Sequence, residues 1–213
     1  MVQPEAPIRS DEETPRISRR RLLIAAVLGT ALGVGGFKLL HAAGGFRINT
    51  VERPTPAIDP AAFRLTVDGA VARPLTLTLD ELKALPSVRQ ISDFHCVEGW
   101  GVSDVRWEGV RLQTLIEMVQ PAQDAGFITF HSSGGTYKDS LTLQQAMLPD
   151  VLLAYHMDGG PLTRDHGYPL RLIVPHMYGY KGPKWLERVE FVKVRETGYW
   201  EDRGWKIDAW INT

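Results

Sequence analysis

Cys96 offers the most chemistry in this sequence, because it is the single cysteine of the chain. It stands in the run Asp93–Trp100, whose letters are DFHCVEGW, beside His95 and Glu98. A thiolate is a soft donor suited to a metal, and a cysteine near a histidine also suits a nucleophile. A thiol between aromatic residues is equally consistent with an inert core position. The spacing alone leaves these three interpretations open.

A second cluster, residues 165–185, combines glycines, histidines and basic residues in the letters DHGYPLRLIVPHMYGYKGPKW. Arg171, Lys181 and Lys184 could gather around a phosphate, arginine through paired hydrogen bonds and lysines as point charges. His166 could donate to an oxyanion or a ring carbonyl. A solvated basic loop is the alternative. The chain has no Walker or Gly-x-Gly-x-x-Gly pattern, so a nucleotide-binding fold gains no support.

Composition narrows the classes of function further. The formal net charge of −1 provides no bulk positive field for nucleic acid, so no nucleic-acid partner is expected. A single cysteine excludes an internal disulfide framework and a cysteine-rich zinc or iron–sulfur site.

Together, the run His95–Trp100 and the run His166–Trp185 resemble the molybdopterin-binding domain of the sulfite-oxidase superfamily, which includes bacterial methionine-sulfoxide-reducing members. The resemblance extends from Phe63 to the Gly198–Glu201 tail. It implies a single α+β domain, strand-rich, with mixed sheets and short helices. It also implies a molybdenum–molybdopterin cofactor without an attached nucleotide, whose metal takes two dithiolene sulfurs, one protein cysteine and oxo or hydroxo groups.

The resemblance assigns roles position by position. Cys96 matches the metal ligand, and His95 and Tyr180 are the further candidate catalytic residues. Asn49 and Glu52 match an upstream cofactor-binding stretch. The other candidate wall groups of the substrate pocket are Trp100, His176 and Tyr178. The positions that match cofactor-binding residues are Ser132, His166, Arg171, Gly182, Pro183 and Lys184, and Lys181 is a further candidate cofactor-binding residue because its charge could reach the phosphate.

The expected function is two-electron oxo transfer outside the cytoplasmic membrane, reducing a small or protein-bound S- or N-oxide. Sulfite oxidation on the same fold is the alternative, but Glu98 stands where a cation would hold the sulfite anion. A non-catalytic membrane-anchored binding protein and a cysteine hydrolase are the other rivals. Because no haem-binding Cys-x-x-Cys-His motif is present, electrons would come from a separate membrane cytochrome b or soluble cytochrome c, and the chain is expected to be a monomer.

The N-terminal region is predicted to be a targeting signal. Residues 1–17 are predicted to be a flexible polar tail. Residues 18–43 resemble a twin-arginine signal, with the letters SRRRLL before the apolar run, and residues 22–40 could remain as an anchor. The arginines before this run place the body on the extracytoplasmic, periplasmic side. Residues 44–60 are predicted to be an extended linker, and residues 61–213 the oxidoreductase domain.

Local patterns predict the elements that position these side chains. Alternation predicts strands at 63–69 and 189–194, and short apolar or β-forming runs predict strands at 75–78, 126–130 and 170–174. Thr78 with Glu81 predicts a capping box for a helix that ends before Pro86. Helical spacing predicts further helices at 112–119 and 141–147, and a turn is predicted at 107–110.

Overall fold

The computed structural model describes residues 45–211, which belong to one compact unit. The predicted tail at 1–17 and the predicted signal or anchor at 18–43 lie outside the described residues. Among residues 45–211, no helix is both long enough and apolar enough to cross a membrane.

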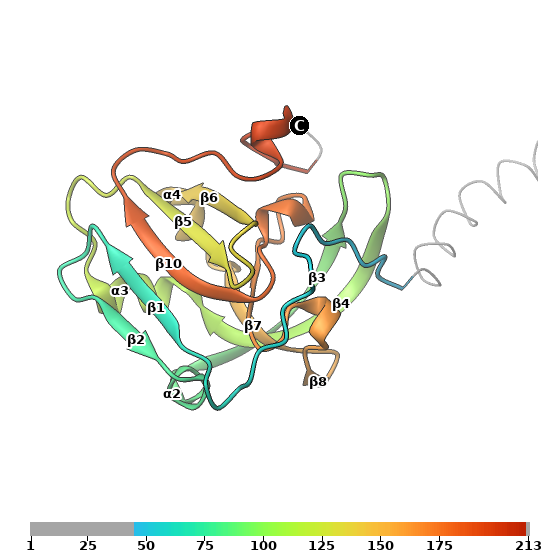
Figure 1. Cartoon of the computed structure of the whole chain (residues 1–213), viewed down its shortest axis with the longest axis horizontal. Helices are drawn as coiled ribbons and strands as arrows, with labels where there is room; N and C mark the ends of the chain where they lie inside the picture. The colour runs from blue at the N-terminus through green and yellow to red at the C-terminus, as the bar shows by residue number, and fades with distance from the viewer. Residues whose placement is uncertain (1–44, 212–213) are drawn as a thin grey trace, which may run out of the picture. The chain divides into compact units, whose positions relative to one another are not determined.

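The described chain is rich in strands, with short helical segments between them (Figure 1). The strands are β1 (Leu65–Gly69), β2 (Leu75–Leu77), β3 (Ser87–His95), β4 (Gly101–Arg111), β5 (Phe127–Ser132), β6 (Lys138–Thr142), β7 (Leu152–Met157), β8 (Gly160–Pro161), β9 (Arg171–Ile173) and β10 (Leu186–Val192). The helical segments are α2 (Leu79–Ala84), α3 (Leu112–Val119), α4 (Leu143–Ala146), η1 (Arg164–His166), η2 (Gly179–Lys181) and η3 (Glu201–Arg203).

Residues 45–211 form two sheets. The first has the strand order β2-β1-β10-β5-β6, in which the β1–β10 pair is parallel and the other pairs are antiparallel. The second has the order β3-β4-β7-β8, with β9 also pairing with β7, and all its pairs are antiparallel. A mixed sheet with few short helices in one domain confirms the predicted α+β class.

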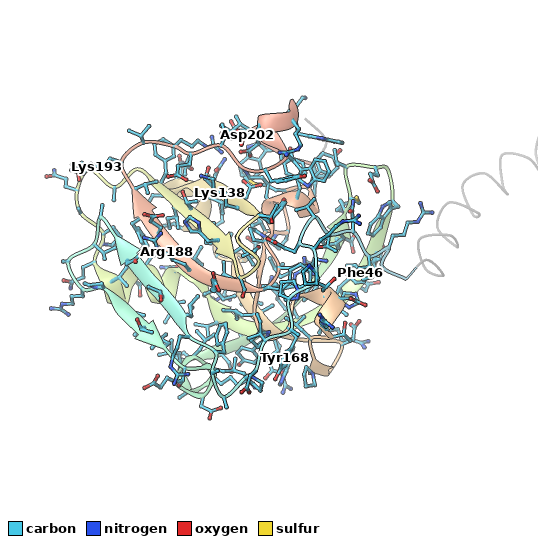
Figure 2. All side chains as sticks on the ribbon, viewed as in Figure 1. Phe46, Lys138, Tyr168, Arg188, Lys193 and Asp202 are labelled. Carbon is cyan, nitrogen blue, oxygen red and sulfur yellow. The ribbon has the colours of Figure 1, made fainter. Side chains whose placement is uncertain are left out.

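Two clusters of buried apolar side chains hold the sheets and helices together, and Figure 2 shows side chains filling the space between the sheets. The larger cluster joins the inner faces of β1, β5 and β10 to α3, whose buried face follows helical spacing. The smaller cluster surrounds Trp107, with Phe46 and Phe94 packed against it. Each fully buried leucine or phenylalanine contributes roughly 1.5–3 kcal/mol. The smaller cluster matters for function because it supports the wall of the pocket described below.

Several local predictions are confirmed. Helix α3 has the predicted bounds, and Thr78 forms the predicted capping box with Glu81 before α2. Helix α4 is shorter than predicted. Its first two predicted residues belong to β6, and Thr142 instead forms a second capping box, with Gln145.

The predicted turn at 107–110 is wrong, because these residues lie inside β4. Gly109 suggested a turn, but it serves close strand approach: a Cβ there would stand 2.1 Å from the Leu153 carbonyl oxygen. The ladder between β4 and β7 shifts register at this glycine. Strand β3 was not predicted, since its residues alternate only between exposed and half-buried and carry no apolar signal.

Candidate active site

Cys96 lies in the loop between β3 and β4, at the end of the second sheet. The loop closes on itself through hydrogen bonds from Cys96 N to Trp100 O (2.8 Å) and from Gly99 N to Cys96 O (3.1 Å). Gly99 has a φ of +85°, which favours glycine. The thiol is free and half-buried. Burial raises the pKa of Cys96, and the carboxylate of Glu98, whose Oε2 lies 3.8 Å from Sγ, raises it further. The raised pKa keeps the free thiol protonated at neutral pH.

Arg171 begins β9 and is 3 % exposed. Its Nη1 donates to the His166 carbonyl oxygen (3.2 Å), whereas its Nε finds no partner among the described residues. The guanidinium lies over the rings of Phe94 and Trp107, at 5.7 and 5.4 Å from their centroids. Burial lowers the pKa of Arg171 to about 10, and no carboxylate of residues 45–211 forms an ion pair with it.

Lys184 supplies a second cation at the same corner of the pocket. Its Nζ donates to the carbonyl oxygens of Asn49 and Asp165, both at 2.9 Å, and lies over the Trp185 ring. Burial, and then the charge of Arg171, lower the pKa of Lys184 to about 8. Both cations are thus held in place by neutral partners only.

His166 completes this cation corner, a name we use for Arg171, Lys184 and His166. Its Nδ1 is 2.7 Å from Thr163 Oγ1, and its buried Nε2 has no partner among the described residues. Burial, Arg171 and Lys184 lower the pKa of His166, so the imidazole is neutral at neutral pH. The Phe46 ring packs edge-on against it at 4.9 Å.

The segment 46–52, part of the predicted linker, forms one wall of the pocket. It is held by Glu52, which is 2 % exposed and accepts from Thr136 N (3.1 Å) and Tyr137 N (2.7 Å). Arg164 also donates to the carbonyl oxygens of residues 55 and 56. Arg47 in this wall is exposed, and its charge lowers the pKa of Cys96. Sequence reasoning missed Arg47, because nothing in an irregular segment indicates which residues it faces.

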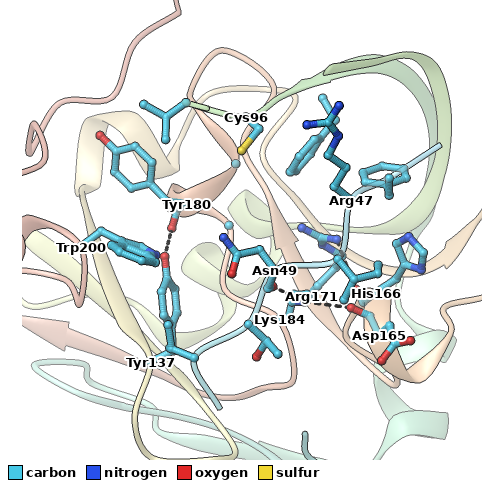
Figure 3. A pocket seen from close by; sticks show the side chains of 18 of the residues that line it. Arg47, Asn49, Cys96, Tyr137, Asp165, His166, Arg171, Tyr180, Lys184 and Trp200 are labelled. Atoms are coloured by element: carbon cyan, nitrogen blue, oxygen red, sulfur yellow. Dashed lines mark hydrogen bonds between the residues drawn. The ribbon is translucent and has the colours of Figure 1, made fainter. Parts of the chain in front are cut away.

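Aromatic side chains form the opposite wall, where Figure 3 shows Tyr137, Tyr180 and Trp200 together. Tyr137 donates its hydroxyl to the Tyr180 carbonyl oxygen, and Tyr180 donates its own to Lys206 O at 2.6 Å. Burial raises the pKa of Tyr180 to about 12, so its hydroxyl stays protonated. Trp205 packs on Tyr180 and Trp200 with ring centroids 6.0 and 6.2 Å apart. Of these four residues, sequence reasoning identified only Tyr180.

The structure brings most of the predicted site residues to this one pocket. Ser132 lines it, but its hydroxyl donates to the Lys184 carbonyl oxygen at 2.7 Å. Gly182 lets η2 approach β9, since a Cβ there would stand 2.5 Å from Leu172 O. The predicted residues that line the pocket are Asn49, Glu52, Cys96, Trp100, Ser132, His166, Arg171, Tyr180, Gly182 and Lys184.

Lys181 is the clearest correction among the predicted residues. Its side chain is fully buried and its Nζ is bound by the carboxylates of Asp139 and Glu201, so it is not available to a phosphate. His176 pairs with Asp150 at 2.8 Å instead of lining the pocket. The remaining predicted residues that do not line the pocket are His95, Tyr178 and Pro183.

The donor set of the pocket indicates the kind of ligand it suits. The cation corner offers Arg171 Nε and His166 Nε2, which have no partner among the described residues, beside one buried and one half-buried cation that form no ion pair there. Such an arrangement leaves a desolvation penalty that an anion rich in hydrogen-bond acceptors would offset. A soft thiol lies in the same pocket (Figure 3). A ligand with a phosphate at one end and a metal that binds thiolate at the other fits both features.

Comparison with known proteins agrees with this geometry. The family model described as oxidoreductase molybdopterin binding domain matches residues 52–200. The uncharacterized oxidoreductase YuiH of Bacillus subtilis is 36 % identical over 156 residues, covering 72 % of this chain and 78 % of that protein. The protein-methionine-sulfoxide reductase catalytic subunit MsrP of Campylobacter jejuni is 32 % identical, covering 65 % of this chain and 52 % of that protein.

Human mitochondrial sulfite oxidase is 33 % identical over 181 residues, but only 33 % of its length is covered. This chain thus spans most of the Bacillus relative and about half or less of the other two. Among solved structures, the sulfane dehydrogenase SoxCD of Paracoccus pantotrophus superposes with a TM-score of 0.61 at 22 % identity. That superposition covers 66 % of this chain and 40 % of the other, and it supports the fold alone.

Proposed function

This chain belongs to the oxidoreductase molybdopterin-binding domain family, and we propose that it reduces a sulfoxide or related S- or N-oxide by two-electron oxo transfer. The observation that carries the proposal is the pairing, in one pocket, of an uncompensated cation corner with a single half-buried thiol. The cofactor of the family is molybdenum–molybdopterin, and the pocket fits it for the reasons given above.

Each part of the pocket has a distinct task in this proposal. Arg171, Lys184 and His166 hold the phosphate and pterin end through charge-assisted hydrogen bonds. Cys96 provides the thiolate ligand. When bound, the cofactor accepts and donates the electron pair that accompanies oxygen transfer. Ser132 holds the backbone of Lys184 in the pocket wall, and Gly182 lets η2 lie close to β9.

The aromatic wall selects the substrate. Trp200 and Trp205 offer apolar surface that excludes water and accommodates the carbon substituents of a sulfoxide. Tyr180 remains protonated and can hydrogen-bond the oxide oxygen once it exchanges its bond to Lys206. The overall reaction consumes two electrons and two protons and releases the oxygen as water. The proposal does not include His95, because it does not line the pocket.

Sulfite oxidation remains the second candidate, because Arg47 places one cation near Cys96. Glu98 lies on the same thiol and opposes a dianion, which favours a neutral, dipolar oxide. Turnover of a neutral sulfoxide with a viologen donor, and no turnover of sulfite with a cytochrome acceptor, is the expected outcome. The reverse preference would establish the second candidate.

The central experiment is the Cys96→Ser variant, analysed together with the wild-type protein for molybdenum and pterin. A hydroxyl is a hard and poorly ionised donor, so sulfoxide turnover is expected to fall steeply and the Mo(V) resonance to change. The cofactor is expected to stay bound through the cation corner. Wild-type turnover with an unaltered Mo(V) signal would refute the ligand role. A hydrolytic activity of metal-free protein that thiol alkylation blocks would instead support a cysteine hydrolase. An absence of both metal and activity would support a binding protein.

Export by the twin-arginine route, to the periplasmic side of the membrane, is part of the proposal. Its support is the sequence before the apolar run, since residues 1–44 lie outside the described structure. Replacing Arg19 and Arg20 with lysine retains charge, so a general secretory signal would still work. Accumulation of cofactor-loaded protein in the cytoplasm is expected, and unchanged export would exclude this route. The electron donor we propose is a membrane cytochrome b or a soluble cytochrome c acting on a monomer.

A further inference from the structure

Within residues 45–211, Thr163 is the residue that hydrogen-bonds to the His166 ring from outside the pocket. Its Oγ1 lies 2.7 Å from His166 Nδ1, while the other ring nitrogen, Nε2, is buried at the cation corner without a partner among the described residues. The hydroxyl makes no helix-capping bond, although Thr163 precedes η1. Among the described residues, the hydroxyl of Thr163 therefore hydrogen-bonds to the histidine ring alone.

The backbone around His166 leaves the ring little freedom. His166 N and Tyr168 N both donate to the Thr163 carbonyl oxygen at 3.1 Å, and Gly167 adopts a φ of +102°. A Cβ on Gly167 would stand 2.8 Å from the Lys184 side chain, so the turn packs directly on the second cation. The Phe46 ring packs edge-on against one side of the imidazole. These contacts fix the position of the ring, but they do not determine which ring nitrogen carries the proton.

The charges nearby make that choice matter. Arg171 and Lys184 offer only donors. Burial, together with these two cations, lowers the pKa of His166 and keeps the ring neutral, with one N–H and one lone pair. A ligand group held by these two cations is rich in acceptors. Only an N–H on Nε2 adds a third donor to it, whereas a lone pair on Nε2 would repel the same oxygens.

We propose that Thr163 is a positioning residue, whose hydroxyl donates to Nδ1 of His166 and so fixes the ring as the Nε2–H tautomer, aimed at the cofactor. A hydrogen-bonded partner on the far nitrogen is a general means of fixing a histidine tautomer. The inference rests on the proposed cofactor corner for its purpose, but the tautomer itself can be measured without any ligand.

The test uses the full-length, cofactor-free protein labelled with ¹⁵N at histidine. His166→Gln identifies the His166 signals, and the wild type is expected to show a protonated Nε2 and a bare Nδ1. Thr163→Val, which keeps the shape and removes the hydroxyl, is expected to give a mixture of tautomers. Thr163→Ser is expected to restore the wild-type spectrum. A wild-type ring protonated on Nδ1, or an unchanged tautomer in Thr163→Val, would overturn the proposal.

A second measurement links the tautomer to binding. Loss of one ordinary hydrogen bond corresponds to about 2- to 13-fold weaker cofactor retention in Thr163→Val, with little change in Thr163→Ser. In a His166→Ala background the same valine substitution is expected to have no further effect, because the residue that Thr163 orients is gone. Equal losses in both backgrounds would show that Thr163 acts elsewhere. Absence of any molybdopterin from wild-type protein would count against the proposed function but leave the tautomer result intact.

Discussion

Lys181 and Lys184 stand three positions apart, yet the charge of Lys181 is compensated by carboxylates and the charge of Lys184 is not. Lys181 is fully buried between the carboxylates of Asp139 and Glu201, whose side chains are 0 and 2 % exposed. Lys184, with Arg171, is held by carbonyl oxygens and has no carboxylate partner among the described residues. The first group, which we call the ion triad, is compensated inside the fold, whereas the cation corner is not.

The difference separates a charge that carboxylates compensate inside the fold from one that has only carbonyl partners among the described residues. The ion triad joins η2 to β6 and to the C-terminal segment that carries Trp200, so it holds the aromatic wall in place. A buried pair that loses one partner leaves an uncompensated charge and strongly destabilises the fold. The cation corner already contains charge that no carboxylate of the described residues compensates, and such charge is typical of functional sites. Removing the lysine of the ion triad should therefore lower the free energy of unfolding. Removing a cation of the cation corner should leave it unchanged or raise it.

The largest effect is expected for Lys181→Met. The substitution leaves Asp139 and Glu201 buried side by side with no cation, which should destabilise the fold by about 3–5 kcal/mol. For a domain of this size that corresponds to a fall in Tm of roughly 6–20 °C. Thermal unfolding of cofactor-free protein measures it. A Tm within about two degrees of wild type, which corresponds to roughly 1 kcal/mol or less, would mean that the triad contributes little net stability.

Arg171→Met tests the cation corner with the same replacement side chain. Removing a charge without a counter-ion should leave the Tm of the cofactor-free protein unchanged or higher. Cofactor affinity should fall by about 10- to 150-fold, which is the loss of a charge-assisted contact of roughly 1.5–3 kcal/mol. Molybdenum content after dialysis measures the second effect. A large fall in Tm with full molybdenum content would reverse our assignment of the two groups.

The same contrast shows which residues of the site could be predicted from the sequence. Motif resemblance identified Arg171, Lys184 and Cys96, and periodicity identified α3, because both signals are local. Lys181 was assigned to the phosphate cluster by its type and its neighbours. Its actual partners lie 42 and 20 positions away, and nothing near Lys181 in the sequence indicates them.

Other features of the site depended on tertiary structure in the same way. Strand β3, which leads to Cys96, carries no apolar alternation because neither of its faces is fully buried. The wall at 46–52 is irregular, and its place is set by a buried Glu52 bonded to the backbone of a distant turn. Nothing in the sequence distinguishes Trp200 and Trp205 from other aromatic residues, and only the folded chain shows that they line the pocket. The cofactor-binding roles themselves stay predictions.

The two groups should also give opposite trends with pH. Burial raises the pKa of Asp139 to about 7, so the folded state keeps a proton that the unfolded state releases. That contribution to stability is complete below the ordinary value of 3.8 and is lost as pH rises through about 7. Lys184 has a lowered pKa of about 8, so the folded state gives up a proton that the unfolded state keeps to 10.5. Stability should therefore rise with pH between those two values.

Tm against pH, measured for cofactor-free protein, separates these trends by difference. Asp139→Asn should flatten the decline between about pH 4 and 7, and Lys184→Met should flatten the rise between about pH 8 and 10.5. Bound cofactor should also abolish the second trend, because an anion beside Lys184 favours its charged form. A rise that persists in Lys184→Met would belong to another group.

The smallest effect is expected for Lys138→Met, which sets the lower limit of the comparison. Lys138 lies on β6, next to Asp139 in the sequence, and its Nζ is 2.6 Å from Glu196 (Figure 2). The two side chains are 42 and 38 % exposed, so water already solvates both charges. Exposed pairs contribute about 0.2–1 kcal/mol, and the substitution should change Tm by a few degrees at most. This difference should shrink further in about 1 M salt, where charges are screened beyond roughly 3 Å. The loss at Lys181 should persist in the same salt, since neither partner there meets solvent. An equal loss at both lysines would show that burial does not distinguish them.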